Sequence, residues 1–106
     1  MKTHETDQQV IDLCQRCADV CTENAQQCRE DGLEECARLC VECATACRNV
    51  VEDGQLDNDL LKLCGDACNA CASKCEAKEH EHCIACAKVC RECEAACFTV
   101  VQEINH

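Results

Sequence analysis

The chain has 106 residues, of which 17 are cysteine, one is phenylalanine and none is proline, tyrosine or tryptophan. This length suits one small domain over residues 1–106, and a formal charge of −11 argues against nucleic acid or an anionic membrane as a partner. Strand-forming residues never alternate with polar ones over a useful length, so we predict an all-α fold.

The first predicted helix runs from about Glu5 to Arg29. Glu30 and Asp31 precede Gly32, which suits the left-handed conformation that follows a helix. The inward face of this helix carries Val10, Leu13, Cys14, Cys17, Val20, Cys21 and Cys28.

The second helix is predicted from Leu33 or Glu34 to Glu52, with Gly54 ending it in the same way. Its cysteines are spaced four, three and four residues apart. At 100° per residue they fall within an arc of roughly 60° and form one stripe along the helix. These residues are Cys36, Cys40, Cys43 and Cys47.

The third helix is predicted to be capped by Asp57 or Asn58 and to continue to about Ala77. It repeats the stripe with Cys64, Cys68, Cys71 and Cys75. Gly65 lies inside it, which suggests a close contact between helices. A turn is placed within residues 78–82, because one helix continuing to Ile104 would be too long for a globular chain.

The fourth helix is predicted from Glu81 or His82 to Ile104, and its stripe consists of Cys83, Cys86, Cys90, Cys93 and Cys97. Short connections favour antiparallel neighbours, and a stripe is buried only against other stripes. We therefore predict an antiparallel up-down-up-down four-helix bundle with a cysteine-lined core.

That topology predicts which thiols share a level. One end should bring together Cys28, Cys36, Cys75 and Cys83. The next level is Cys21, Cys43, Cys68 and Cys90, followed by Cys14 or Cys17, Cys47, Cys64, and Cys93 or Cys97. The opposite end should be a hydrophobic plug of Val10, Leu13, Val50, Val51, Leu60, Leu61, Phe98, Val101 and Ile104. His4 and His106 are expected near the plug and are given no role.

Metal binding is the chemistry that this pattern favours. Leucine would bury more area at each position, and disulfides fit poorly with an odd cysteine number and bridges that would close very small loops within a helix. Five Cys-x2-Cys pairs occur in phase on the predicted helices. Almost pure thiolate ligation selects Cu(I), zinc or iron–sulfur clusters. All 17 cysteines are candidate metal ligands.

Cu(I) suits a continuous ladder of thiols best, because it accepts low-coordinate sites that share ligands. Zinc prefers closed sets of four ligands, and an iron–sulfur cluster needs one four-cysteine pocket. A zinc or cadmium buffer and an iron–sulfur electron-transfer protein remain as alternatives. Each Cu⁺ that replaces a proton leaves the interior charge unchanged, so the metal-free bundle should fold with neutral thiols.

His80 and His82 lie in the third connection, beside the thiol end. They form either an ordinary polar turn or a pair that helps to bind or pass copper. No catalytic pair, phosphate loop or cofactor fingerprint is present, so an enzyme is not expected. The first 13 residues show no leader, and no apolar run of about 18 residues occurs. We therefore expect a cytoplasmic protein whose thiols stay reduced.

The complete stripes that start at Cys36, Cys64 and Cys86 resemble those of the bacterial copper storage proteins, and the resemblance spans the whole chain. It implies storage of many Cu(I) ions inside the bundle and a homotetramer of bundles. The missing leader resembles the cytosolic branch of that family. Val10 departs from the pattern, because the stripe would place a cysteine there. A copper chaperone or a small-molecule thiol is the expected delivery or removal partner.

Overall fold

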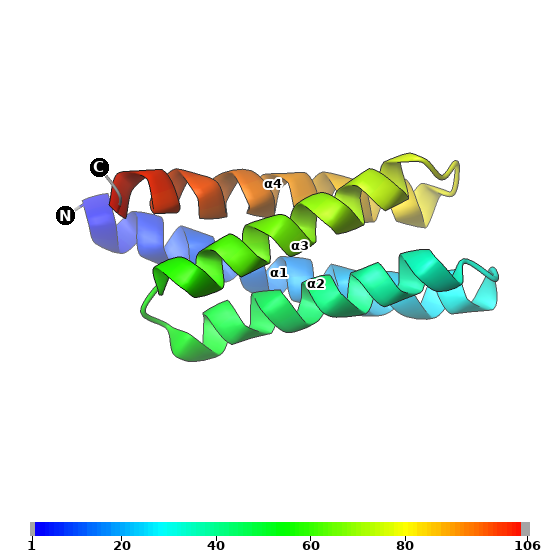
Figure 1. Ribbon diagram of the computed structural model, residues 1–106, viewed down its shortest axis with the longest axis horizontal. Coiled ribbons are helices and arrows are strands. Elements are labelled where there is room, and N and C mark those ends of the chain that lie inside the picture. Colours follow the sequence, from blue (N-terminus) through cyan, green and yellow to red (C-terminus); the bar gives the residue numbers. More distant parts are fainter. Residues whose placement is uncertain (1, 105–106) are drawn as a thin grey trace.

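A computed structural model describes the backbone of residues 2–104 and the side chains of residues 7–102. Within that range the chain forms four helices and no strand, and the helices are α1 (Lys2–Glu30), α2 (Glu34–Asp53), α3 (Asn58–Glu76) and α4 (Glu81–Ile104). Consecutive helices run antiparallel, and each packs against two neighbours in a ring (Figure 1). The predicted four-helix bundle is confirmed, and it measures 45 × 22 × 20 Å.

The helix boundaries lie within one residue of the predicted ones except at the start of α1. This helix begins at Lys2 rather than Glu5, because the segment between them contains no glycine or proline to interrupt it. None of the helices in the described part combines the length and the apolar character that crossing a membrane would require.

The first and third connections lie at the same end of the bundle (Figure 1). At the first, Gly32 has φ +79°, and the Leu33 N–H donates to the Cys28 carbonyl at 2.7 Å. This is a Schellman motif, and it reverses the chain directly after the last cysteine of α1. At the third, the His80 carbonyl accepts from the N–H groups of Cys83 and Ile84, both at 3.0 Å, which starts α4.

The opposite end holds the start of α1, the end of α4 and the second connection (Figure 1). Gly54 closes α2 in the left-handed conformation, and the Asp57 carboxylate caps α3 by accepting from the backbone N–H groups of Asp59 and Leu60. Leu56 and Val100 are buried here too, in addition to the predicted residues. The predicted plug is buried at Val10, Val50, Leu61 and Val101 and half-buried at Leu13, Val51, Leu60 and Phe98. The side chains of His4, Ile104 and His106 lie outside the described residues.

Gly65 makes the close helix contact that its position suggested. A Cβ atom at this residue would lie 2.6 to 3.0 Å from three ring atoms of Phe98. Because Gly65 has no side chain, the Phe98 ring of α4 packs directly on the backbone of α3, next in sequence to the first thiol of that helix, Cys64.

Candidate metal centre

All 17 cysteines are free thiols buried inside the bundle. Cys36 is 1 % exposed and every other cysteine is 0 % exposed. The four stripes thus face one another and form a single column of sulfur atoms along the bundle axis, which we call the thiol column.

The layer nearest the plug is built around Cys14. Its Sγ lies 3.7 Å from that of Cys93, 3.9 Å from Cys64 and 4.0 Å from Cys97. Cys47 joins the layer through a 3.5 Å contact with Cys64. The four helices all contribute, as the predicted third level required, and Cys14 rather than Cys17 supplies the α1 sulfur.

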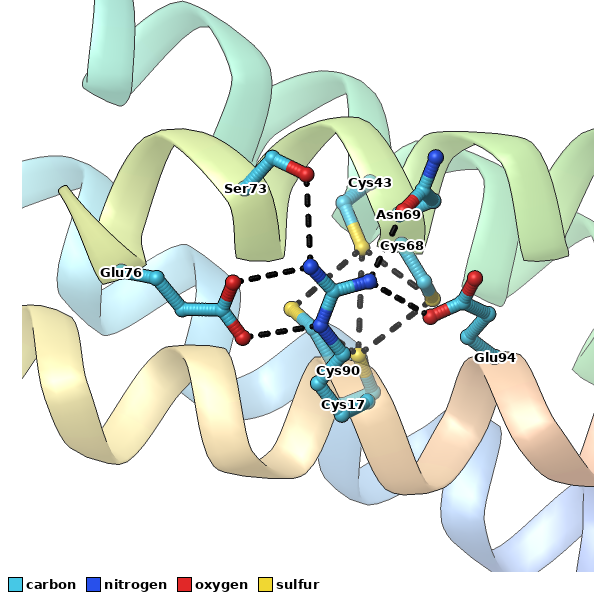
Figure 2. Close-up of polar contacts among 9 residues, drawn as sticks. Cys17, Cys43, Cys68, Asn69, Ser73, Glu76, Cys90 and Glu94 are labelled. Atoms are coloured by element: carbon cyan, nitrogen blue, oxygen red, sulfur yellow. Dashed lines mark hydrogen bonds and ion pairs between the residues drawn. The ribbon is translucent and has the colours of Figure 1, made fainter.

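The central layer contains Cys17, Cys43, Cys68 and Cys90 (Figure 2). The Sγ of Cys17 lies 3.8 to 3.9 Å from the other three, and Cys43 lies 3.5 Å from Cys68. Cys21, which was predicted at this level, lies one turn of α1 closer to the first connection, with its Sγ 3.6 Å from that of Cys90.

A further layer, not anticipated as a level, separates the centre from the thiol end. Cys40 and Cys71 approach to 3.5 Å across α2 and α3, and Cys21 lies 3.7 Å from Cys86. The predicted end group then follows as two pairs, Cys36–Cys75 at 3.4 Å and Cys28–Cys83 at 3.9 Å. We call this group of four thiols the mouth.

The layers are not separate sites, because successive groups share sulfur atoms. At least five sets of four buried thiols have all their Sγ atoms within 4.8 Å of one another. Each set shares at least one cysteine with the next along the column. The sets are Cys14/Cys64/Cys93/Cys97, Cys17/Cys47/Cys68/Cys93, Cys17/Cys21/Cys43/Cys90, Cys21/Cys71/Cys86/Cys90 and Cys40/Cys71/Cys75/Cys86. The arrangement therefore offers a continuous series of neighbouring soft ligands.

No positively charged side chain lies inside the described bundle to balance a thiolate. Among the residues whose side chains the structure describes, Asn24 is the one buried polar residue, and no buried side chain is basic. Burial raises the pKa of the Cys28 and Cys83 thiols, and the neighbouring Cys36 adds to both shifts. Hydrogen bonds between neighbouring thiols shift the pKa of the two partners in opposite directions: downward at Cys14, Cys17, Cys43, Cys64, Cys71 and Cys86, and upward at partners such as Cys21, Cys47 and Cys90. These hydrogen bonds supply no positive charge, and burial disfavours the thiolate at each of these positions, so we expect the metal-free column to hold its protons at neutral pH.

The outer surface is polar where α3 meets α4. The Arg91 guanidinium donates to both carboxylate oxygens of Glu76 at 2.8 Å, to Asn69 at 2.8 Å, to Glu94 at 2.9 Å and to Ser73 at 3.3 Å (Figure 2). These contacts raise the pKa of Arg91 and lower that of Glu76. They tie the two helices together outside the central layer and leave the thiols untouched.

The two predicted histidines lie at the mouth. His82 Nδ1 is 3.6 Å from Cys83 Sγ, and its Nε2 is 2.8 Å from Asp31 Oδ2. His80 is more exposed, and its Nδ1 lies 3.6 Å from the same carboxylate oxygen. The structure thus brings His82 into contact with the thiols and leaves His80 on the outside.

Asn24 is a site residue that the sequence reasoning missed. It lies three residues after Cys21 and four before Cys28, so it occupies a position of the α1 stripe. Its side-chain Nδ2 donates to the Sγ atoms of Cys40 at 3.2 Å and Cys75 at 3.6 Å. The spacing of the α1 stripe puts residue 24 on the same helix face as the thiols, and this signal could have identified Asn24 although it is not a cysteine.

Comparison with known proteins agrees with this geometry. The family model described as "Copper storage protein" matches residues 2–102. No curated protein matches the chain.

Proposed function

Because the chain belongs to the copper storage protein family, we propose that it stores and buffers Cu(I) in the cytoplasm through the thiolates of its 17 cysteines. Copper is the cargo, and the protein is not an enzyme. Ions arrive at the mouth and move inward by exchange between neighbouring thiolates. The capacity is about one ion per thiol, because low-coordinate Cu(I) sites can share ligands.

The observation that carries this proposal is the continuous, uncompensated thiol column. Neighbouring Sγ atoms no more than 4.8 Å apart follow one another from Cys75 of the mouth to Cys97 beside the plug, and the described interior holds no basic side chain. One Cu⁺ in place of each thiol proton keeps this interior neutral. Many monovalent ions can therefore occupy the column together without the cost of burying net charge.

A zinc or cadmium buffer is the second candidate, and one feature favours it. A tetrahedral Zn–S distance of about 2.3 Å gives sulfur–sulfur edges of about 3.8 Å, which matches the central layer around Cys17. Four thiolates around one Zn²⁺ leave two negative charges, however, and the overlapping sets cannot all be filled at once. An iron–sulfur cluster has less support, because the thiols form a long column rather than one pocket.

Metal competition tests the choice between copper and zinc. Reduced, metal-free protein would be mixed anaerobically with Cu(I) and Zn²⁺ in equal excess, separated from free ions and analysed for both elements and by native mass spectrometry. We expect a colourless product that contains many copper ions and little zinc. A product that holds up to four zinc ions and excludes copper would overturn the proposal, because 17 thiols provide at most four separate sets of four.

We also propose that His80 and His82 make the first contacts with incoming copper. His82 supports this through its position 3.6 Å from the mouth thiol Cys83. The double variant His80→Ala/His82→Ala should change the rates of copper uptake and removal and keep the capacity of the column. Unchanged rates would leave the two residues as an ordinary polar turn.

The remaining partners are proposals from the family resemblance. A copper chaperone or a small-molecule thiol would exchange copper at the mouth, and the bundle would assemble as a homotetramer. Val41 and Leu63 are 40 % and 61 % exposed on one apolar groove between α2 and α3, a surface that assembly could cover. Light scattering at several protein concentrations would measure the assembly, and a monomer throughout would exclude the tetramer.

A further inference from the structure

Asn24 differs from every other residue of the inward stripes that lies between the mouth and the plug. It is the single buried polar side chain of the described residues, with 3 % exposure, and it stands where the spacing of α1 calls for a thiol. Burying an amide without hydrogen-bond partners is unfavourable, because the group loses its hydrogen bonds to water. Its retention at this depth therefore depends on the hydrogen bonds that it makes.

Both ends of the Asn24 amide are engaged, on opposite sides. On the inner side Nδ2 donates to the Sγ atoms of Cys40 and Cys75. On the outer side Oδ1 accepts from His82 Nδ1 at 2.5 Å, and His82 Nε2 lies 2.8 Å from Asp31. A continuous chain of polar contacts thus runs from the surface of the mouth to the first thiols of the column.

Cys75 is the thiol through which the mouth joins the column. It contacts Cys36 of the mouth at 3.4 Å, and it belongs to the set of the column nearest the mouth, with Cys40, Cys71 and Cys86. That set draws its sulfur from α2, α3 and α4, while α1 contributes the amide of Asn24 instead. An ion that moves inward from Cys36 therefore passes the residue that Asn24 holds.

We propose that Asn24 is a positioning residue that gates this passage. Its amide keeps Cys40 and Cys75 hydrogen-bonded and ties them to the His82–Asp31 pair across the mouth. Copper passes from the mouth into the column only when these hydrogen bonds open, so Asn24 controls the rate of transfer and not the number of ions stored. The copper part of this inference rests on the proposed function, whereas closure of the mouth concerns the metal-free protein itself.

Alkylation of the metal-free protein tests the closure without copper. Reduced protein would be treated briefly with iodoacetamide under single-modification conditions, and each cysteine would be quantified by peptide mass spectrometry. Cys40 and Cys75 are fully buried, so their modification is limited by opening of the structure. Loss of one hydrogen bond of ordinary net strength corresponds to about a fivefold change in an opening equilibrium. We expect Asn24→Ala to increase alkylation of these two thiols by about that factor or more.

Two variants separate a hydrogen-bonded gate from simple filling of space. Asn24→Leu has a similar volume and no hydrogen bonds, so it should open the passage as Asn24→Ala does. Asn69→Ala removes an amide from the outer Arg91 network and should leave every rate unchanged. Wild-type rates in Asn24→Leu would show that volume alone closes the passage and would overturn the proposal. Equal acceleration at Cys14 and Cys97 would show general loosening and would overturn it as well.

Copper kinetics complete the test. Transfer of Cu(I) from a coloured chelate should be faster in Asn24→Ala and Asn24→Leu than in the wild type, with the final copper content within one ion of the wild-type value. Unchanged transfer rates would refute the gate even if the capacity is large. A small capacity in all variants would instead refute the proposed function, so the two failures are distinguishable.

Discussion

Copper loading should release protons from the thiol column in a fixed ratio. The 17 thiols are buried at 0 to 1 % exposure, burial raises the pKa of Cys28 and Cys83, and the described interior contains no basic side chain to hold thiolates. We therefore expect the metal-free column to be neutral at pH 7. Each thiol must lose its proton to become a ligand, so complete loading should release about 17 protons per chain.

The ratio of protons to ions makes this measurement decisive. In weakly buffered, oxygen-free solution at pH 7 containing a pH indicator, Cu(I) supplied as a complex of a weak neutral ligand should release about one proton per ion until saturation. Zinc held by four thiolates should release about four per ion. The same titration of protein alkylated after unfolding provides the control. Clearly fewer protons than copper ions would mean that the column already contains thiolates, and the neutral-interior argument would then fail.

Three further predictions concern stability. Because burial raises the pKa of Cys28 and Cys83 above the ordinary 9.0, the folded state keeps protons that the unfolded chain loses, and stability present below pH 9 should fall as the pH rises further. The metal-free protein should therefore unfold at a lower urea concentration near pH ~10 than at pH ~7.5, and equal unfolding midpoints would contradict this. Leu61→Ala, at a fully buried plug position, should lower the free energy of unfolding measured in urea by about 2–5 kcal/mol and leave the copper content in native mass spectrometry unchanged. A loss of several ions would show that the plug is part of the binding site. Asp57→Ala removes the cap of α3 and should cost about 1 kcal/mol, and no change in the unfolding midpoint would show that this cap is dispensable.

The fold could be predicted because its signals are local and repeated. Cysteines at the spacing of Cys36, Cys40, Cys43 and Cys47 can share one face only on a helix, and short connections containing Gly32 and Gly54 leave antiparallel packing as the simplest arrangement. The same reasoning placed the mouth, because thiols adjacent to connections at one end must meet there.

The parts that escaped prediction depend on geometry between helices. Cys17 and Cys21 lie one turn apart and both contact Cys90, and the shift of α1 along α2 and α3 brings Cys17 rather than Cys21 against Cys43 and Cys68. Leu56 is buried in the second connection with a backbone φ of +53°, a conformation that its residue type does not signal. Asn24 was overlooked for a different reason: its role follows from partners on α2, α3 and α4 that only the folded bundle brings together.

The central claim is that one chain stores many Cu(I) ions in a preformed bundle. It is tested most directly by anaerobic titration of the reduced protein with Cu(I) against a competing Cu(I) chelator, followed by native mass spectrometry and by circular dichroism of the metal-free form. We expect a helical spectrum before any metal is added and uptake of more than about ten ions, close to one per thiol. Saturation at about one to four ions would contradict storage and would indicate a discrete site of the zinc or iron–sulfur type.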